Sequence, residues 1–154
     1  MRVFRITKHI YSEDLTGDGA RIHGGRWNHR GTSVVYASES RALATTEYLV
    51  HVPMALVPDD LSIVTIQIPD TARQETIIPE KLPDNWRTYP SPRDLADIGS
   101  RWVIERRSLV LRVPSVVVQG DFNILINPAH TQMAGVKIHS IDPYELDKRL
   151  LRVH

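Results

Sequence analysis

The apolar residues of this chain occur mainly in short runs with the spacing of β-strands, separated by Pro, Gly and Asn. RVFRI (2–6) alternates, which places Val3 and Arg5 on one face and Phe4 on the other. LSIVTIQI (61–68) is rich in β-branched residues and stops at Pro69. Five further runs are predicted to be short strands: SVVYA (33–37), SLVLRV (108–113), SVVV (115–118), FNILI (122–126) and VKIHSI (136–141).

Three segments carry helix signals instead, and the first follows the SVVYA run. Either Ser38 or Ser40 can act as its N-cap, where a side-chain oxygen accepts a backbone N–H of the first turn. The helix is predicted to run to about His51, because Pro53 cannot continue it.

The other two predicted helices lie later in the chain. SPRDLADIGSRWVIERR (91–107) has Ser91 as its cap, Pro92 in the first turn and Asp94 where a cap partner is expected. DPYELDKRLL (142–151) is predicted to be a capped amphipathic helix.

Two segments are predicted to be irregular. Residues 17–31 hold five of the eight glycines and are expected to form a tightly turning loop, while 69–93 carry five prolines and are expected to be a long surface excursion. Short strands with few helices and no regular βαβ alternation predict an α+β fold. At 154 residues, we expect one domain spanning 1–154.

Composition excludes several classes of function. The chain is 42% apolar and 24% charged, as in soluble globular proteins, and its net charge of +1 gives no field that attracts nucleic acid or an anionic membrane. The absence of Cys excludes disulfides, thiolate nucleophiles and Cys-based zinc sites. There is no signal-peptide core, and no run approaches the roughly 18 apolar residues of a membrane span. We expect a cytoplasmic protein.

The first candidate for chemistry is Glu47. On the predicted helix it shares a stripe with Leu43 and Val50, which are apolar. A carboxylate on a core-facing stripe is costly unless it is paired or lines a cavity. The alternatives are a residue at the edge of the stripe, or one in a salt bridge with an arginine.

Arg26 and Tyr36 precede Glu47 on neighbouring elements. The glycines of GGRWN let the backbone approach an anion, and the guanidinium can bind phosphate through two parallel hydrogen bonds. Tyr36 alternates with Val34 in an apolar strand, so from the residues alone a half-buried core tyrosine is the simpler interpretation. Trp27 is interpreted as a packing residue.

Other candidates are less distinctive. Arg5 faces either the core or a cleft. Ser115, in VPS, has no nucleophile-elbow pattern and is interpreted as a hydrogen-bond donor rather than a nucleophile. NPAH (127–130) is typical of a turn. The histidines lack the spacing of metal ligands, so no metal site is expected.

The segment GARIHGGRWNHRGTSVVYASESRALATTEYL (19–49), followed in order by VPS (113–115) and NPAH (127–130), closely resembles the RES-domain family. Its members are toxins of RES–Xre type II toxin–antitoxin systems. The resemblance spans nearly the whole chain, from FRI (4–6) to the last predicted strand.

This resemblance implies a fold similar to ADP-ribosyltransferases, with a split β-core around an NAD⁺ cleft and helices outside. The Arg, Glu and Ser positions that give the family its name match Arg26, Glu47 and Ser115. Ser108 and Ser100 lie in the same region and remain alternatives for the serine.

The resemblance also implies that NAD⁺ is the substrate and that no further cofactor is needed. Water (a glycohydrolase) or inorganic phosphate (a phosphorylase) would cleave the nicotinamide–ribose bond, which depletes cellular NAD⁺ and arrests growth. Glu47 would face the positive charge that develops on the ribose, while Arg26 and Arg5 would hold the pyrophosphate. Tyr36 would provide an aromatic wall or a ribose contact, and Ser115 would hydrogen-bond the nicotinamide-ribose end.

The partner implied by the resemblance is an Xre-type antitoxin with a helix-turn-helix part, which covers the toxin's site. DNA would then be contacted only through the antitoxin, and a homodimer is plausible within the complex. The Pro-rich segment 69–93 is a lid, an antitoxin contact or a plain loop.

Two rival functions stay open. The first is an ADP-ribosyltransferase that modifies a cellular protein. Such enzymes often carry a carboxylate or Gln two residues before the catalytic Glu, where this chain has Thr45, so the usual protein-modifying motif is disfavoured. The second is an inactive domain that binds its antitoxin as a co-repressor, and the presence of Arg26, Tyr36 and Glu47 argues against it.

Overall fold

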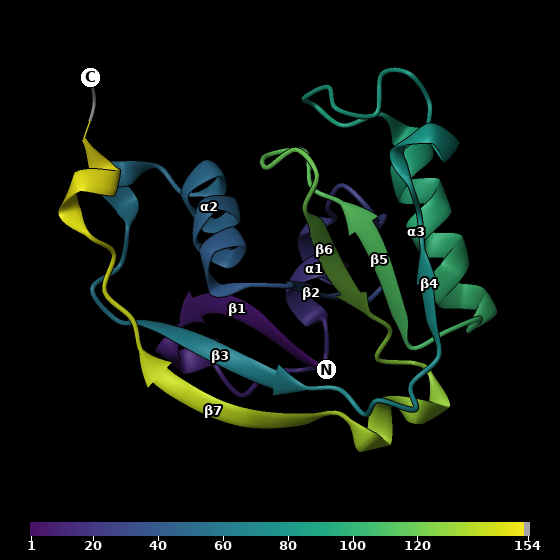
Figure 1. Cartoon of the computed structure of the whole chain (residues 1–154), viewed down its shortest axis with the longest axis horizontal. Coiled ribbons are helices and arrows are strands. Elements are labelled where there is room, and N and C mark those ends of the chain that lie inside the picture. Colours follow the sequence, from purple (N-terminus) through teal and green to yellow (C-terminus); the bar gives the residue numbers. More distant parts are fainter. Residues whose placement is uncertain (153–154) are drawn as a thin grey trace.

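The structure is a computed structural model that describes residues 1–152. These residues form one seven-stranded sheet with the strand order β4-β5-β6-β2-β1-β3-β7 (Figure 1). Neighbouring strands are antiparallel except β4 and β5, which are parallel. The strands are β1 (Arg2–Lys8), β2 (Val35–Ser38), β3 (Leu61–Gln67), β4 (Gln74–Thr76), β5 (Val110–Pro114), β6 (Phe122–Ile126) and β7 (Lys137–Pro143).

The sheet is divided into two halves at the junction of β1 and β2. Strand β1 pairs with β3 along its whole length, but it meets β2 at a single residue pair, Phe4 with Ser38. In Figure 1 the strands β7, β3 and β1 of one half lie across the view, whereas β5 and β6 of the other half are steeply inclined to them and run in opposite directions. The fold is therefore α+β with the split β-core that was expected.

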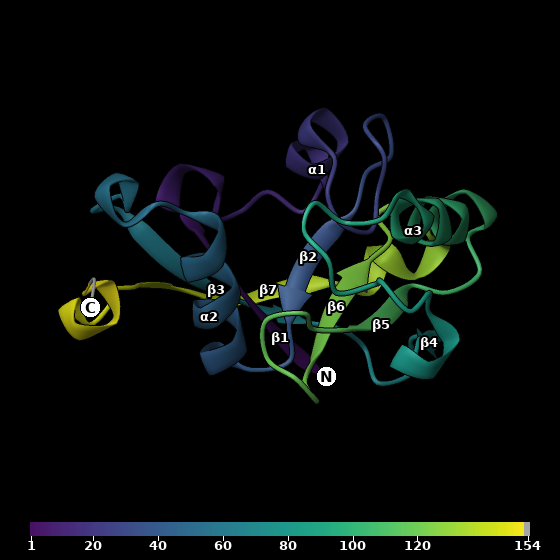
Figure 2. The same ribbon diagram turned by 90° about the horizontal axis from the view of Figure 1, so that it is seen from above.

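Three α-helices flank the sheet within residues 1–152: α1 (Asp18–His23), α2 (Arg41–His51) and α3 (Arg93–Glu105). Seen from above, α2 and α3 lie over different halves (Figure 2). Helix α2 packs through Ala44 against β1 and β3, and α3 packs through Trp102 against β5 and β6. Among the described residues, no helix combines the length and the apolar character needed to cross a bilayer.

A third apolar cluster joins the two halves. It combines Val3, Val64 and Ile66 from one half with residues of the other half and of the connections: Val35, Ala37, Val110, Ile124, Ile126, Ile68, Leu109 and Val136. These side chains are nearly all fully buried. Burial of apolar surface thus holds together two half-sheets that share little backbone pairing.

The helix predicted after SVVYA is confirmed, and the choice between its two caps is decided. Ser40 is the N-cap, and its Oγ accepts the N–H of Leu43 at 3.0 Å. Ser38 belongs to β2 instead. The helix ends at His51, as predicted.

The strand predicted at 115–118 is wrong. After Pro114 the chain bends, and the Oγ of Ser115 accepts the N–H groups of both Val117 and Val118. A side chain that bonds the backbone two and three residues ahead favours a turn over a ladder, whatever the β-propensity of the valines.

The helix predicted at 142–151 is also wrong, except for a 3-10 turn at Lys148–Leu151. Asp142 and Pro143 extend β7 by pairing with β3, and the N–H of Tyr144 donates to the carbonyl of Leu61. Leu146 is then buried against that half of the sheet. Tertiary pairing and burial override the local helix pattern here.

The predictions for the irregular segments and the second helix need smaller corrections. The glycine-rich loop 17–31 contains the short helix α1, and the excursion 69–93 contains β4 and a 3-10 turn at Pro79–Lys81. Ser91 is not a cap: Pro92 occupies the N-cap position without a side-chain hydrogen bond, and α3 begins at Arg93.

The remainder of the glycine-rich loop, residues 24–31, is fixed against α3. The carbonyl oxygen of Trp27 approaches Gly99 so closely that an added Cβ would lie 1.8 Å from it. Ser100 Oγ accepts the N–H of His29 at 2.9 Å, and the His29 ring contacts Asp97 at 2.6 Å. Helix α3 therefore sets the position of the loop that carries Arg26.

We predict that Gly99→Ala lowers the free energy of unfolding by about 2–3 kcal/mol, because the new methyl group meets backbone that cannot move without displacing the loop. Urea denaturation measures the change. Gly19→Ala in α1 is the matched control, since its Cβ would meet no heavy atom within 4 Å, and we expect no loss of stability. Equal effects of the two substitutions would contradict the docking described here.

Candidate functional site

Glu47 lies on the inner side of α2 with 19% of its side chain exposed. Its Oε1 atom accepts two hydrogen bonds, from Ser115 Oγ at 2.7 Å and from Asn123 Nδ2 at 2.6 Å. Its Oε2 atom lies 3.9 Å from Nε2 of His51. The carboxylate is thus half-buried and hydrogen-bonded, which is the condition under which a charge on a core-facing stripe is tolerated.

Ser115 is the serine that the structure brings to Glu47. Ser108 accepts the indole N–H of Trp102 beneath α3, and Ser100 accepts the N–H of His29. Of the three serines, Ser115 is therefore the one that hydrogen-bonds Glu47, while the two alternatives bond other partners.

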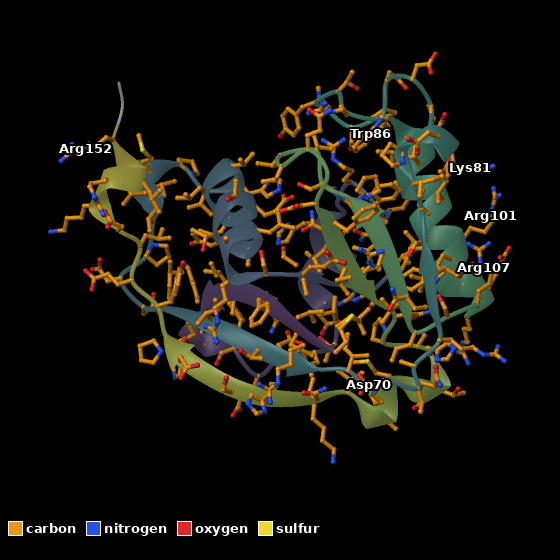
Figure 3. All side chains as sticks on the ribbon, in the orientation of Figure 1. Asp70, Lys81, Trp86, Arg101, Arg107 and Arg152 are labelled. Atoms are coloured by element: carbon orange, nitrogen blue, oxygen red, sulfur yellow. The ribbon has the colours of Figure 1, made fainter. Side chains whose placement is uncertain are left out.

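Arg26 projects from the glycine-rich loop towards the segment between β4 and α3. Its Nη1 donates to the carbonyls of Trp86 at 2.9 Å and Thr88 at 3.2 Å. Figure 3 shows Trp86 near the end of the sheet where β5 gives way to the 115–121 loop. Burial lowers the pKa of Arg26, and the nearby Glu47 carboxylate opposes this shift. The Glu47 carboxylate therefore favours the charged form of Arg26.

Tyr36 supports the Arg26 loop from below. Its hydroxyl donates to Asn28 Oδ1 at 2.6 Å and accepts the N–H of Trp27 at 3.2 Å. Gly25 allows this approach, because a Cβ there would lie 2.8 Å from the hydroxyl oxygen. Burial raises the pKa of Tyr36. The Tyr36 hydroxyl is thus bound within the protein, and Tyr36 also lines the cleft described next.

Arg5 lines a cleft of about 460 Å³ that it shares with Tyr36, Tyr11 and Asp14. Its Nη2 lies 3.5 Å from the carbonyls of Tyr11 and Ser12, and its buried Nε has no hydrogen-bond partner within residues 1–152. Burial lowers the pKa of Arg5, partly offset by Asp14. Because Arg5 is among the residues that line this cleft, it faces a cleft rather than the core.

The predicted residues form two groups that meet at Tyr36. Arg5 and Tyr36 line the cleft, whereas Glu47 and Ser115 lie outside its lining. Tyr36 is also connected to Arg26, because its hydroxyl forms hydrogen bonds with Trp27 and Asn28 of the loop that carries Arg26. The structure thus places Arg5 in the cleft, and it places Arg26 and the hydrogen-bonded carboxylate of Glu47 outside the lining of that cleft.

Asn123 is the residue that sequence reasoning missed. It bonds Glu47 through Nδ2, and its Oδ1 accepts from Ser38 Oγ at 2.8 Å. A polar residue inside the apolar run FNILI was the available signal, but it did not identify the partner.

The structure also bears on the NPAH segment and on the grouping of residues that could bind a metal ion. NPAH forms a turn in which Asn127 Oδ1 accepts the N–H of Ala129, and Asn127 Nδ2 donates to the carbonyl of Val103, so the turn interpretation is confirmed. Among the described residues, no three His, Cys, Asp or Glu side chains are grouped so as to share a metal ion.

Comparison with known proteins gives consistent matches along the chain. The family model of the RES domain matches residues 2–148. "Prs ADP-ribosylating toxin" of Sphingobium sp. (strain YBL2) is 41% identical over 143 residues, which cover 92% of this chain and 89% of that protein. "Toxin Res" of Yersinia enterocolitica is 35% identical over 153 residues, covering 97% of this chain and 99% of that protein.

A solved structure supports the fold. The M. tuberculosis MbcT–MbcA toxin–antitoxin complex contains a chain that aligns with a TM-score of 0.71 and 17% sequence identity. The alignment covers 93% of this chain and 83% of that one. At this identity the likeness concerns the fold alone.

We predict that Tyr36→Phe lowers the free energy of unfolding by about 1–3 kcal/mol, because it leaves the Asn28 oxygen and the Trp27 N–H without their partner. Urea denaturation of the variant against wild type measures the loss. The control is Tyr89→Phe, at a side chain that is 87% exposed, and it should be neutral. Unchanged stability in Tyr36→Phe would mean that the hydroxyl does not support the loop.

Proposed function

This chain belongs to the RES domain family, and we propose that it is the toxin of a toxin–antitoxin system that cleaves the bond between nicotinamide and ribose in NAD⁺. The consequence in the cell is loss of NAD⁺ and arrest of growth. The site of action is the cytoplasm, NAD⁺ is the substrate, and no other cofactor is required.

The observation that carries this proposal is the held carboxylate of Glu47. Nicotinamide leaves NAD⁺ as a neutral base, so the reaction needs little acid catalysis. The barrier lies in the positive charge that develops on the ribose, as it does in glycoside hydrolysis. A fixed anion facing that charge stabilises the transition state more than the ground state.

The two arginines suit the pyrophosphate of the substrate. Within the described residues Arg26 donates through Nη1 only, which leaves Nε and Nη2 for an anion. Arg5 lines the cleft beside Tyr36 and provides a second guanidinium there. Holding the phosphates at these points would orient the ribose relative to Glu47.

Water or inorganic phosphate is the acceptor that the geometry favours. Thr45, two residues before Glu47, is buried, and its hydroxyl bonds the Arg41 carbonyl and the Tyr144 hydroxyl. Protein-modifying enzymes often engage their target from this position. In this chain the residue there, Thr45, is buried and its hydroxyl is already hydrogen-bonded within the protein.

The second candidate is ADP-ribosyl transfer to a cellular protein, which the name of the Sphingobium relative favours. Both candidates share cleavage of the same bond and differ in the acceptor. An inactive co-repressor is disfavoured, because Arg26, Tyr36 and Glu47 are all present.

We also propose an antitoxin of the Xre type as the partner that covers the site. Support comes from the fold shared with a chain of a toxin–antitoxin complex. Contact with DNA would then run through the antitoxin, in keeping with a net charge of +1, and a toxin homodimer within the complex is part of the same proposal.

The experiment that tests the function is nicotinamide release by purified, antitoxin-free protein, with and without inorganic phosphate. Water as acceptor yields ADP-ribose, and phosphate yields its 1″-phosphate ester. Labelled NAD⁺ added with a cell extract reports transfer to protein. No release and no transfer from folded protein would overturn the proposed activity.

We predict that Glu47→Gln lowers the turnover of NAD⁺ by about 100-fold or more, since the isosteric amide lacks the charge. The fold should persist, because an amide oxygen can still accept from Ser115 and Asn123. Nicotinamide release measures turnover, and Glu145→Gln, at an exposed glutamate, is the control. Wild-type turnover in Glu47→Gln would remove Glu47 from the mechanism.

We predict that Arg26→Ala weakens NAD⁺ binding by about 10–100-fold, corresponding to the loss of a charge-assisted contact of about 1.5–3 kcal/mol. Isothermal titration of NAD⁺ into the Glu47→Gln background measures affinity without turnover. Arg30→Ala removes an exposed cation from the same loop and should bind normally. If Arg26→Ala binds as well as its parent, Arg26 does not hold the phosphates.

A further inference from the structure

We propose that Asn123 and Ser115 are positioning residues that hold the Glu47 carboxylate in one orientation and leave its Oε2 atom as the oxygen that meets the ribose. The inference rests on the proposed function, because it assigns how the reactive carboxylate of that function is presented. Asn123 was not among the residues that the sequence singled out.

The orientation of the Asn123 amide follows from its two neighbours. A carboxylate only accepts hydrogen bonds, so the NH₂ group must face Glu47 Oε1, at 2.6 Å. The amide oxygen then faces Ser38 Oγ, which donates to it at 2.8 Å. Ser38 is buried and is the register partner of Asn123 across β2 and β6. The sheet itself therefore fixes the amide.

The direction of the Ser115 hydrogen bond is determined in the same way. Its oxygen accepts from the backbone N–H groups of Val117 and Val118 at 3.1 and 3.0 Å. Since both lone pairs are used, the hydroxyl proton is directed to Glu47 Oε1 at 2.7 Å. Ser115 thus acts through Glu47 rather than on the nicotinamide-ribose end.

Both donors converge on the same oxygen, and this decides which oxygen is left for the substrate. The neighbour of Oε2 is the His51 ring, whose Nε2 lies 3.9 Å away on a side chain that is 69% exposed. Two bonds to Oε1, from β6 and from the end of β5, prevent rotation about the last side-chain bond of Glu47. The carboxylate is therefore oriented before the substrate binds, which is the preorganisation that raises a rate at unchanged affinity.

The test compares Asn123→Asp, Asn123→Ala and Ser115→Ala with wild type. Asn123→Asp is isosteric and still accepts from Ser38, but it replaces the N–H donor to Glu47 with a carboxylate. We expect kcat for nicotinamide release to fall by about 10–100-fold in each variant, while KM for NAD⁺ stays within about 3-fold. Ser62→Ala, which removes a buried hydroxyl bonded to His9, is the matched control and should keep its kcat.

A second measurement is independent of activity. The side-chain NH₂ resonances of Asn123 in a ¹⁵N-labelled sample should shift in Glu47→Ala and in Ser38→Ala, whereas they should not respond to Ser62→Ala. Unaltered NH₂ resonances in Glu47→Ala, or wild-type kcat in Asn123→Ala, would overturn the proposal. If wild-type protein released no nicotinamide, the proposed function would fail, and the resonances would still decide whether Asn123 holds Glu47.

Discussion

The weak junction between β1 and β2 is the constraint on which the rest of this structure depends. With one residue pair between them, the two halves of the sheet can diverge, and the protein needs other links across the gap. Helix α2 provides one of them. Its apolar side packs on the β1–β3 half, while Glu47 reaches Ser115 and Asn123 on the other. A half-buried carboxylate is tolerated there because its bonds are made, and the same bonds give it a defined direction.

The division of the sheet also explains the placement of the two arginines. Arg5 stands on β1, in the first half. Arg26 stands on a loop that is fixed to α3 over the second half, through Gly99 and Ser100. Tyr36, on β2 at the boundary, contacts the cleft of one and the loop of the other. The two arginines therefore stand on parts of the protein that backbone pairing leaves almost unconnected.

The sequence predicted the features that depend on local physics. A capped helix beginning near Ser40 follows from capping alone and is present. The stripe predicted around Glu47 is only partly present, because Leu43 is buried whereas Val50 is exposed at the end of the helix. The failures share one cause, which is a partner distant in sequence or a side chain that competes with the backbone. Ser115 turns a valine-rich run into a bend, and β3 draws 142–143 out of a predicted helix. Asn123 could not be assigned because its partner Glu47 lies 76 residues away.

The packing of α2 also bears on the choice of acceptor. Thr45 and Glu47 lie on different sides of the helix: the Thr45 hydroxyl bonds Tyr144 in the C-terminal segment, whereas Glu47 faces β5 and β6. A carboxylate at position 45 would be buried beside a tyrosine and a backbone carbonyl, away from the side of the helix that carries Glu47. Water or phosphate as the acceptor needs no second polar side chain on this helix, since one carboxylate in a fixed orientation can position a small nucleophile. A protein acceptor would have to be engaged by side chains outside α2, which makes the small acceptors the simpler fit to this helix.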